Sequence, residues 1–224
     1  MVYSETTVNA QRFLASAFDT VEDLLSALDV VRTYRKQTEG KGSKGALATN
    51  EQDLLRAAIA LSGAGLDSSL KQLLRDALPR LLREPDSQAS KELLAYSTRR
   101  IAATQSVDPE ATAALLLAAN PRDVLLTGFV EEMTGASIQS VAAVHRLASV
   151  LGMPQRHDVR AAINALRPSF EARNQVAHEL DLQVPLGQGD RQKRTRTMNQ
   201  TVPLIHSMLD VPQRLINNVA SVLA

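Results

Sequence analysis

The chain has 224 residues, of which 44% are hydrophobic and 3% aromatic, with no cysteine and a formal net charge of +1. This length is enough to bury a hydrophobic core as one large domain or two small ones. The missing cysteines exclude disulfides, thiolate zinc sites and cysteine nucleophiles, and the balanced charge confines any RNA or DNA binding to a local patch.

The first predicted element is a helix over about residues 6–36, which carries one apolar face. A polar loop with three glycines follows, and Asn50 is a suitable cap for a second helix. This second helix contains Gly63 and Gly65, which either interrupt it or allow another helix to approach very closely. We expect the interruption, after which the apolar pattern resumes as far as Leu81.

Further helices are expected over about residues 88–104, 108–119, 120–133, 137–151 and 158–179. A loop then leads to a last helix over about residues 194–223. No alternating strand pattern with turn signals occurs, so the predicted fold class is all-α. No linker or repeat of fixed period divides the chain, and we therefore expect a single domain over residues 1–224.

No targeting or membrane signal is visible in the sequence. The first five residues lack the charged and then apolar pattern of a secretory signal, and no apolar run reaches the ~18 residues of a membrane span. Together with the absence of cysteine, this pattern predicts a cytoplasmic protein with no membrane partner.

The helix over residues 158–179 places polar residues where its own period calls for leucine or isoleucine. Its apolar positions are spaced by four, three and four residues, at Val159, Ile163, Leu166 and Phe170. The next positions of the same stripe are Arg173, Asn174, Ala177 and His178. Burying a polar group without partners costs roughly 1–3 kcal/mol. These polar groups therefore either have structural partners or carry chemistry.

The chemistry that fits them is RNA transesterification. Asn174 and His178 are four residues apart and share a helix face, so the amide can hold the imidazole in orientation. The Arg173 guanidinium suits bidentate binding of a phosphate. A histidine can take the proton of a 2′-OH, which attacks the phosphorus while the cation stabilises the extra charge, with no metal required. The structural alternative, which spacing alone favours, is that cations and histidine suit the negative end of any helix.

The segment Phe-Glu-Ala-Arg-Asn-Gln-Val-Ala-His-Glu at residues 170–179 resembles the signature of HEPN domains. In that family an Arg, often followed directly by Asn, precedes a His by four to six residues. The resemblance is close over about residues 158–181 and loose over 50–181. It implies an antiparallel helical bundle with additional peripheral helices outside residues 50–181.

The resemblance also implies a function. Arg173 and His178 would be catalytic and Asn174 would support them, in a composite cleft that two copies of the chain form as a homodimer. Cleavage would leave 2′,3′-cyclic phosphate and 5′-hydroxyl ends without a cofactor or metal. The chain would then be a metal-independent endoribonuclease, a toxin or antiviral (phage-defence) effector, with an antitoxin or regulatory partner possible. The alternative is a non-catalytic HEPN-like scaffold for dimerisation or for binding nucleotide or RNA.

Residues after the motif histidine refine this expectation. Some toxin members have, two positions after the His, a Tyr that an antitoxin modifies, but here that position is Leu180, so this regulation is not expected. Glu179 and Asp181 are possible helpers, although a role as surface acids is favoured for both.

A basic cluster directly before the last helix is a second candidate site, formed by Arg191, Lys193, Arg194 and Arg196. Because four cations oppose the positive end of a helix dipole, we interpret the cluster as a phosphate-binding surface for RNA rather than only a solvated helix start. The remaining histidines, His145, His157 and His206, are never three or four residues apart, so no helical His-His metal pair exists.

Overall fold

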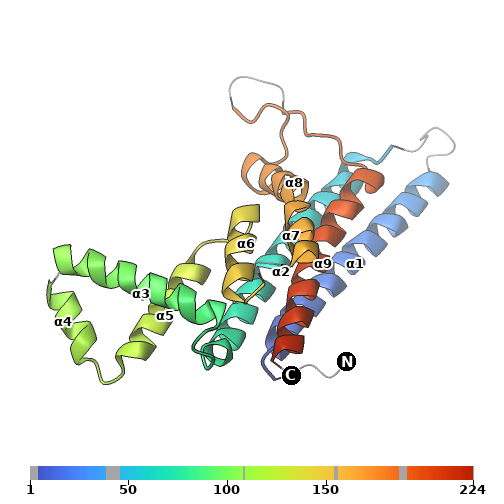
Figure 1. Ribbon diagram of the computed structural model, residues 1–224. Helices are drawn as coiled ribbons and strands as arrows, with labels where there is room; N and C mark the ends of the chain where they lie inside the picture. Colours follow the sequence, from blue (N-terminus) through green and yellow to red (C-terminus); the bar gives the residue numbers. More distant parts are fainter. Residues whose placement is uncertain (1–4, 39–45, 108, 154–155, 187–190, 224) are drawn as a thin grey trace.

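The computed structural model describes residues 5–38, 46–107, 109–153, 156–186 and 191–223 (Figure 1). Its helices are α1 (Val8–Thr38), α2 (Thr49–Leu81), α3 (Gln88–Val107), α4 (Pro109–Leu117), α5 (Pro121–Gly135), α6 (Val141–Val150), α7 (His157–Asn164), α8 (Arg167–Glu179) and α9 (Met198–Val222). The only strand-like pairing in these ranges is an isolated bridge between Leu182 and Lys193. The predicted all-α class is therefore confirmed. None of the described helices combines the length and apolar character needed to span a bilayer.

The long helices α1, α2 and α9 lie side by side and form the main body of the molecule, with α8 packed against α2 and α9 and α7 packed against α9 (Figure 1). In α1 the buried residues Leu14, Val21 and Leu28 are seven apart, which is the spacing of a helix that contacts its neighbour along one seam. Helix α2 is buried along most of its length because α1, α8 and α9 all contact it. The core therefore forms around α2.

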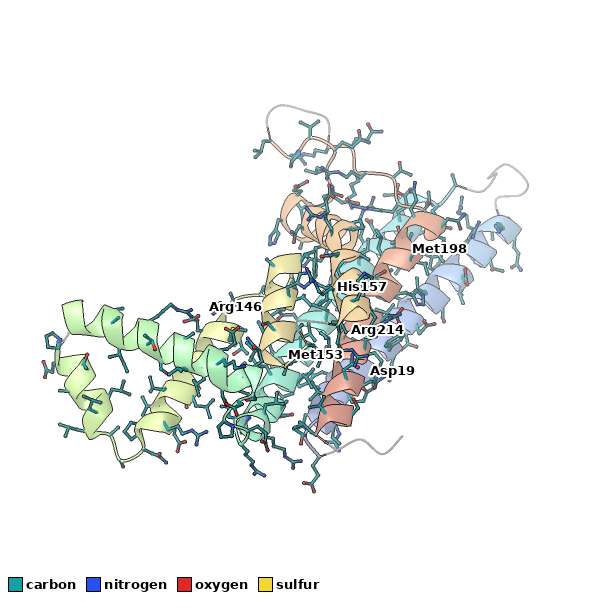
Figure 2. All side chains as sticks on the ribbon, viewed as in Figure 1. Asp19, Arg146, Met153, His157, Met198 and Arg214 are labelled. Atoms are coloured by element: carbon teal, nitrogen blue, oxygen red, sulfur yellow. The ribbon has the colours of Figure 1, made fainter. Side chains whose placement is uncertain are left out.

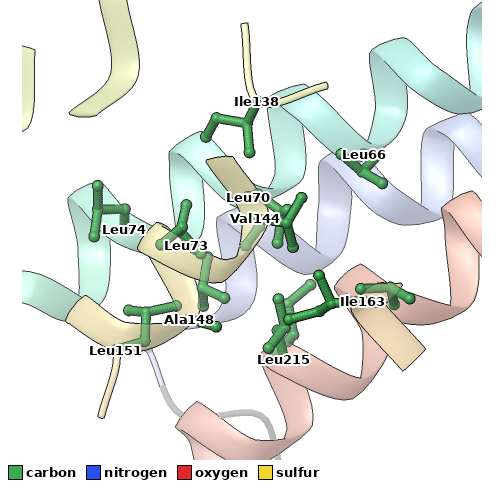
Figure 3. Packing of buried hydrophobic residues seen from close by; sticks show 14 of the residues in the cluster. Leu66, Leu70, Leu73, Leu74, Ile138, Val144, Ala148, Leu151, Ile163 and Leu215 are labelled. Carbon is green, nitrogen blue, oxygen red and sulfur yellow. The ribbon is translucent and has the colours of Figure 1, made fainter. Parts of the chain in front are cut away.

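The centre of the core is filled by leucines of α2 together with residues of α6, α7 and α9 (Figure 3). Leu70 and Leu73 of α2 lie near Val144 of α6, while Ile163 of α7 and Leu215 of α9 close the other side. All five side chains are buried. Aliphatic packing without large aromatics is what the composition predicts.

Helices α3, α4 and α5 form an arm that projects to one side of the main body (Figure 1). Within it the rings of Tyr96 and Phe129 pack with their centroids 5.2 Å apart. Arg146 of α6 lies at the junction (Figure 2) and forms an ion pair with Glu132 of α5. The arm is thus joined to the main body through α2 and α6.

The predicted motif helix over residues 158–179 is wrong in one respect, because it is two helices. Helix α7 ends at Asn164, and α8 begins at Arg167 with Pro168 in its first turn. A proline cannot donate a backbone hydrogen bond, and its ring clashes with the carbonyl four residues earlier, here that of Asn164. The apolar stripe nevertheless continues across the break, since Leu166 and Phe170 are both buried.

Two other predicted boundaries differ from the structure. Helix α6 begins at Val141 rather than 137, because the Ser140 side chain accepts a hydrogen bond from the backbone N–H of Ala143 and caps the helix there. The last helix begins at Met198 rather than 194. The residues before it form an extended segment, and ion pairs of Lys193, Arg194 and Arg196 hold this segment in place.

The expected interruption of α2 at Gly63 and Gly65 is wrong, because the helix runs unbroken from Thr49 to Leu81. The alternative of close helix approach is what the structure shows. A Cβ added to Gly65 would lie 2.3 Å from the Cβ of Ala17 in α1, far inside van der Waals contact. The glycine therefore sets the spacing between α1 and α2.

Replacing Gly65 by alanine is expected to lower the free energy of unfolding by roughly 1–3 kcal/mol, because the new methyl overlaps that of Ala17. Urea unfolding followed by circular dichroism measures this. Gly135→Ala is the matched control, since a Cβ there meets nothing within 4 Å. In the Gly65→Ala background, Ala17→Gly should recover part of the loss. Wild-type stability of Gly65→Ala would contradict the close approach.

Candidate functional site

The three motif residues Arg173, Asn174 and His178 lie together at the C-terminal end of α8. Arg173 Nη1 donates hydrogen bonds to Asn174 Oδ1 at 3.2 Å and to His178 Nε2 at 3.1 Å. Because a guanidinium has no acceptor and does not lose its proton, the Nε2 of His178 must be the acceptor. An imidazole that accepts this hydrogen bond through Nε2 carries its proton on Nδ1. The sequence predicts that Asn174 contacts the imidazole itself, whereas the structure links the two through Arg173.

The motif is not buried, contrary to the expectation from the apolar stripe. Asn174, Ala177 and His178 are exposed and Arg173 is half-buried. The buried residues of α8 are Ser169, Phe170 and Ala172, so the buried part of the stripe ends before the motif. The cost of burying polar groups therefore does not arise for Asn174 and His178, and the imidazole faces solvent in the single chain.

Gly63 of α2 provides the surface on which the Arg173 side chain rests. A Cβ at position 63 would lie 3.0 Å from Arg173 Cγ and 3.7 Å from its Nε. That Nε is buried and has no hydrogen-bond partner among the described residues. Among the described residues the Arg173 guanidinium also has no carboxylate partner, so its positive charge is available to an anion. Gly63 is noticeable in the sequence, but the prediction made for it there is a helix break.

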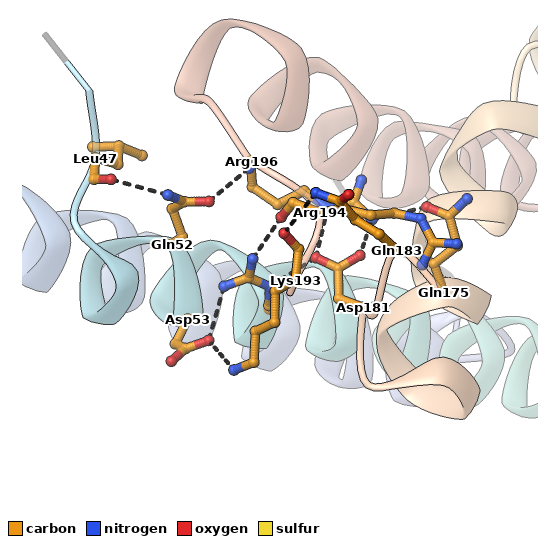
Figure 4. A network of polar contacts seen from close by, with 10 residues as sticks. Leu47, Gln52, Asp53, Gln175, Asp181, Gln183, Lys193, Arg194 and Arg196 are labelled. Atoms are coloured by element: carbon orange, nitrogen blue, oxygen red, sulfur yellow. Dashed lines mark hydrogen bonds and ion pairs between the residues drawn. The ribbon is translucent and has the colours of Figure 1, made fainter. Parts of the chain in front are cut away.

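The buried carboxylate of Asp181 lies just beyond the end of α8, directly after the motif (Figure 4). Leu180 and Asp181 both adopt left-handed backbone conformations, with φ of 51° and 58°, and the N–H of Asp181 donates to the carbonyl of Gln175 at 2.8 Å. The Asp181 carboxylate accepts hydrogen bonds from Arg56 Nε at 2.7 Å and Arg196 Nε at 3.0 Å. The chain direction after His178 is therefore set by residues far away in the sequence.

The interpretation of Asp181 as a surface acid is wrong, because its relative exposure is 0%. Burial by itself raises the pKa of this carboxyl, but hydrogen bonds and charge from Arg196 and Arg56 outweigh burial and hold the pKa below its ordinary value. Asp181 is thus charged in the folded protein. It anchors the end of the motif helix to α2 through Arg56 and to the segment before α9 through Arg196.

The basic cluster lies in the extended segment before α9, and most of its cations have acidic partners. Lys193 pairs with Asp53 at 2.8 Å, Arg194 pairs with Glu179 at 2.9 Å, and Arg196 pairs with Asp181. The guanidinium of Arg56 also donates to the backbone carbonyl of Arg194 at 2.7 Å (Figure 4). These cations fasten the segment to α2 and to the end of α8.

Arg191 differs from the rest of this cluster. It is exposed and has no ion-pair partner within the described residues. An RNA-binding role for the cluster stays a prediction, and Arg191 is the member whose charge is open to a phosphate. The other three could contribute only by giving up their present carboxylate partners.

Two of the cavities in the described part of the molecule bear on the choice of site. A groove of about 530 Å³ runs beside Asn174, between the start of α6 and α8. A larger cavity of about 690 Å³ lies in the arm among α3, α4 and α5, where its lining is mostly apolar. Only the groove adjoins the motif, and it belongs to the same site.

The described residues contain no group of three or more histidine, aspartate or glutamate side chains that could hold a metal ion. His145 Nε2 lies 2.8 Å from Asn164 Oδ1, which links α6 to the end of α7. His157 begins α7, and His206 is exposed on α9. These three histidines lie outside the motif.

Comparison of the chain with protein-family models, with curated proteins and with solved structures found no match in any of the three.

Proposed function

We propose that the chain is a metal-independent endoribonuclease of HEPN type, which cleaves RNA by attack of a 2′-OH and serves as a toxin or phage-defence effector. The observation that carries the proposal is the contact between Arg173 Nη1 and His178 Nε2 at 3.1 Å on an exposed helix end. A permanent cation without a carboxylate partner among the described residues and an imidazole nitrogen lie side by side there. This pair is what phosphoryl transfer without a metal requires.

The contact suggests how the two side chains divide the reaction. A phosphate that binds bidentately to Arg173 draws the guanidinium toward its oxygens and frees the lone pair of His178 Nε2. Nε2 then takes the proton of the 2′-OH, O2′ forms its bond to phosphorus, and the bond from phosphorus to O5′ breaks. The products are a 2′,3′-cyclic phosphate and a 5′-oxygen, which must receive a proton as it leaves.

A homodimer would supply that second proton donor. In the family that the motif resembles, two copies of the motif meet in one cleft, and a two-fold axis beside α8 would bring a second His178 to the leaving oxygen. The exposure of His178 in the single chain is compatible with such a shared cleft. The proposal thus includes a homodimer with RNA as its substrate.

The test is incubation of the purified protein with total tRNA and mRNA in EDTA. The wild type should produce discrete fragments with 2′,3′-cyclic phosphate and 5′-hydroxyl ends, and the Arg173→Ala/His178→Ala double variant should produce none. Intact RNA in both reactions, with the wild type shown to be a folded dimer over several concentrations, would contradict the proposal. A non-catalytic scaffold would then be the better interpretation.

Gly63→Ala should lower the cleavage rate, though by less than the roughly 100-fold loss that a misplacement of about 1 Å can cause, because a methyl at this position crowds the Arg173 side chain at 3.0 Å and displaces it slightly. The unfolding free energy should not fall, because alanine is favoured over glycine inside a helix by roughly 1 kcal/mol. Single-turnover cleavage and urea unfolding separate the two effects. Unchanged cleavage, equal to that of the Gly135→Ala control, would show that Gly63 does not position Arg173.

A further inference from the structure

The groove beside the motif contains charged groups that the structure leaves without partners. It is formed by the start of α6 and by one face of α8, and its volume of about 530 Å³ falls in the range of sites for small molecules. Arg167 and Glu171 are one helical turn apart and both line it. Neither forms an ion pair with the other or with another residue in the described part of the chain. A cation and a carboxylate are therefore both open to a ligand.

Hydrogen-bonding groups complete the lining. The Oδ1 of Asn174 is occupied by Arg173, which leaves its amide nitrogen free to donate. Gln139 donates through Nε2 to the carbonyl of Gly63 at 3.3 Å, whereas its Oε1 is buried without a partner. The buried ring of Phe170 supplies an apolar wall. The groove thus offers donors, acceptors and an apolar surface next to the catalytic pair.

The charges of the groove argue against a second phosphate as its ligand. The unpaired carboxylate of Glu171 lies beside Arg167 and offsets its charge, while Glu179 is already paired with Arg194, so the groove offers a second phosphate no net positive charge. A planar heterocycle with both donor and acceptor edges fits better, because it uses the carboxylate and the guanidinium together without adding charge. In RNA such a group is the base next to the scissile phosphate, which single-stranded substrates present unpaired.

We propose that this groove binds a guanine base of the RNA substrate, adjacent to the phosphate that Arg173 holds; this assignment rests on the proposed function. Guanine alone combines the O6 and N7 acceptors, which a guanidinium such as that of Arg167 binds with two hydrogen bonds, with two adjacent N–H donors. Those donors, N1–H and N2–H, match the two oxygens of the Glu171 carboxylate. Adenine presents no such pair of donors, and the pyrimidines lack the O6 and N7 pair.

The test measures binding in the His178→Ala protein, which should hold RNA without cutting it. The probes are short labelled oligoadenylates with one central guanine, inosine, 7-deazaguanine or adenine. The guanine oligonucleotide should bind about tenfold more tightly than the adenine one, the effect expected of one good bidentate contact. Inosine, which lacks the N2 amino group, and 7-deazaguanine, which lacks N7, should each lose part of that preference.

Glu171→Gln in the same protein should abolish the preference for guanine over inosine. The matched control is Asp210→Asn, which neutralises an exposed acid on α9 and should keep the preference. Equal binding of the guanine and adenine oligonucleotides would overturn the assignment. So would a preference that survives Glu171→Gln unchanged.

Two further outcomes distinguish a failure of the guanine site from a failure of the proposed nuclease activity. If the wild type cleaves the oligonucleotides without regard to base, the guanine site is wrong and the nuclease stands. If guanine is preferred in binding but the wild type cuts no RNA, the site is supported and the nuclease is wrong. Free GMP distinguishes RNA from a nucleotide ligand, because binding of GMP as tight as that of the oligonucleotide would overturn the assignment to an RNA substrate.

Discussion

Replacing His178 by alanine is expected to lower the rate of RNA cleavage by about 100- to 10,000-fold, the usual contribution of a general acid or base. The imidazole is exposed, and among the described residues its side-chain hydrogen bond is with Arg173, so its removal should leave the fold intact. Single-turnover cleavage of a labelled RNA measures the rate, and the unfolding midpoint confirms the fold. His206→Ala, another exposed histidine, on α9, is the matched control and should cleave at the wild-type rate.

Arg173→Lys provides the companion measurement. Lysine keeps the positive charge but loses the planar fork that can hold a phosphate with two hydrogen bonds and still reach the imidazole. We expect a loss of about 100-fold, comparable to the removal of one transition-state donor. A fall of equal size in RNA affinity alone, with an unchanged rate at saturation, would mean that Arg173 binds the substrate but does not stabilise the transition state. Wild-type cleavage by both variants would remove the motif from catalysis.

The helical fold was predictable because its signals are local. Apolar spacing and capping residues act within a few positions of each other, and they place the ends of α1, α2 and α9 within a few residues of their observed positions. Pro168 is also a local signal, but the predicted single helix over residues 158–179 does not take it into account. In the structure this proline lies where the expected motif helix divides into two. The arrangement of α3, α4 and α5 as a projecting arm depends on contacts between elements, which periodicity does not contain.

The motif was predictable in the same local sense, but its surroundings were not. Arg173 and His178 lie five positions apart near the end of one helix, so the sequence places them close together, although their contact also needs the reach of the long arginine side chain. Gly63 lies more than a hundred residues earlier, and nothing in its neighbourhood indicates that it supports Arg173. Similarly, Arg56 and Asp181 are 125 positions apart, and a sequence pattern cannot pair one acid with one arginine among many.

The basic cluster shows that the charge of a side chain does not by itself make that side chain available to a ligand. In the sequence its four cations are equivalent, and together they indicate a surface for phosphate. In the structure Lys193, Arg194 and Arg196 have carboxylate partners, which come from α2 and from the end of α8. Counting charges therefore overstates the basic surface, and Arg191 is the member that a phosphate can reach without breaking an ion pair.

Asp181→Ala is expected to lower the free energy of unfolding by about 3–5 kcal/mol, the usual loss when one partner of a buried ion pair is removed. The substitution leaves Arg56 and Arg196, both nearly buried, without the carboxylate that they share. It also releases the turn that follows the motif, so the cleavage rate should fall as well. Urea unfolding at pH 7 measures the stability, and Asp210→Ala, an exposed acid on α9, should leave the midpoint unchanged.

The pH dependence gives a second measure of the same anchor. Because the pKa of Asp181 is lowered in the folded protein, its stabilisation is fully present above the unfolded pKa of about 3.9 and is lost as the pH falls through the folded value. Asp181→Asn, which cannot titrate, should therefore lose less stability than the wild type between about pH 5 and the acid limit of folding. Parallel acid profiles for the two proteins would mean that the charge of Asp181 does not hold the end of the motif helix in place.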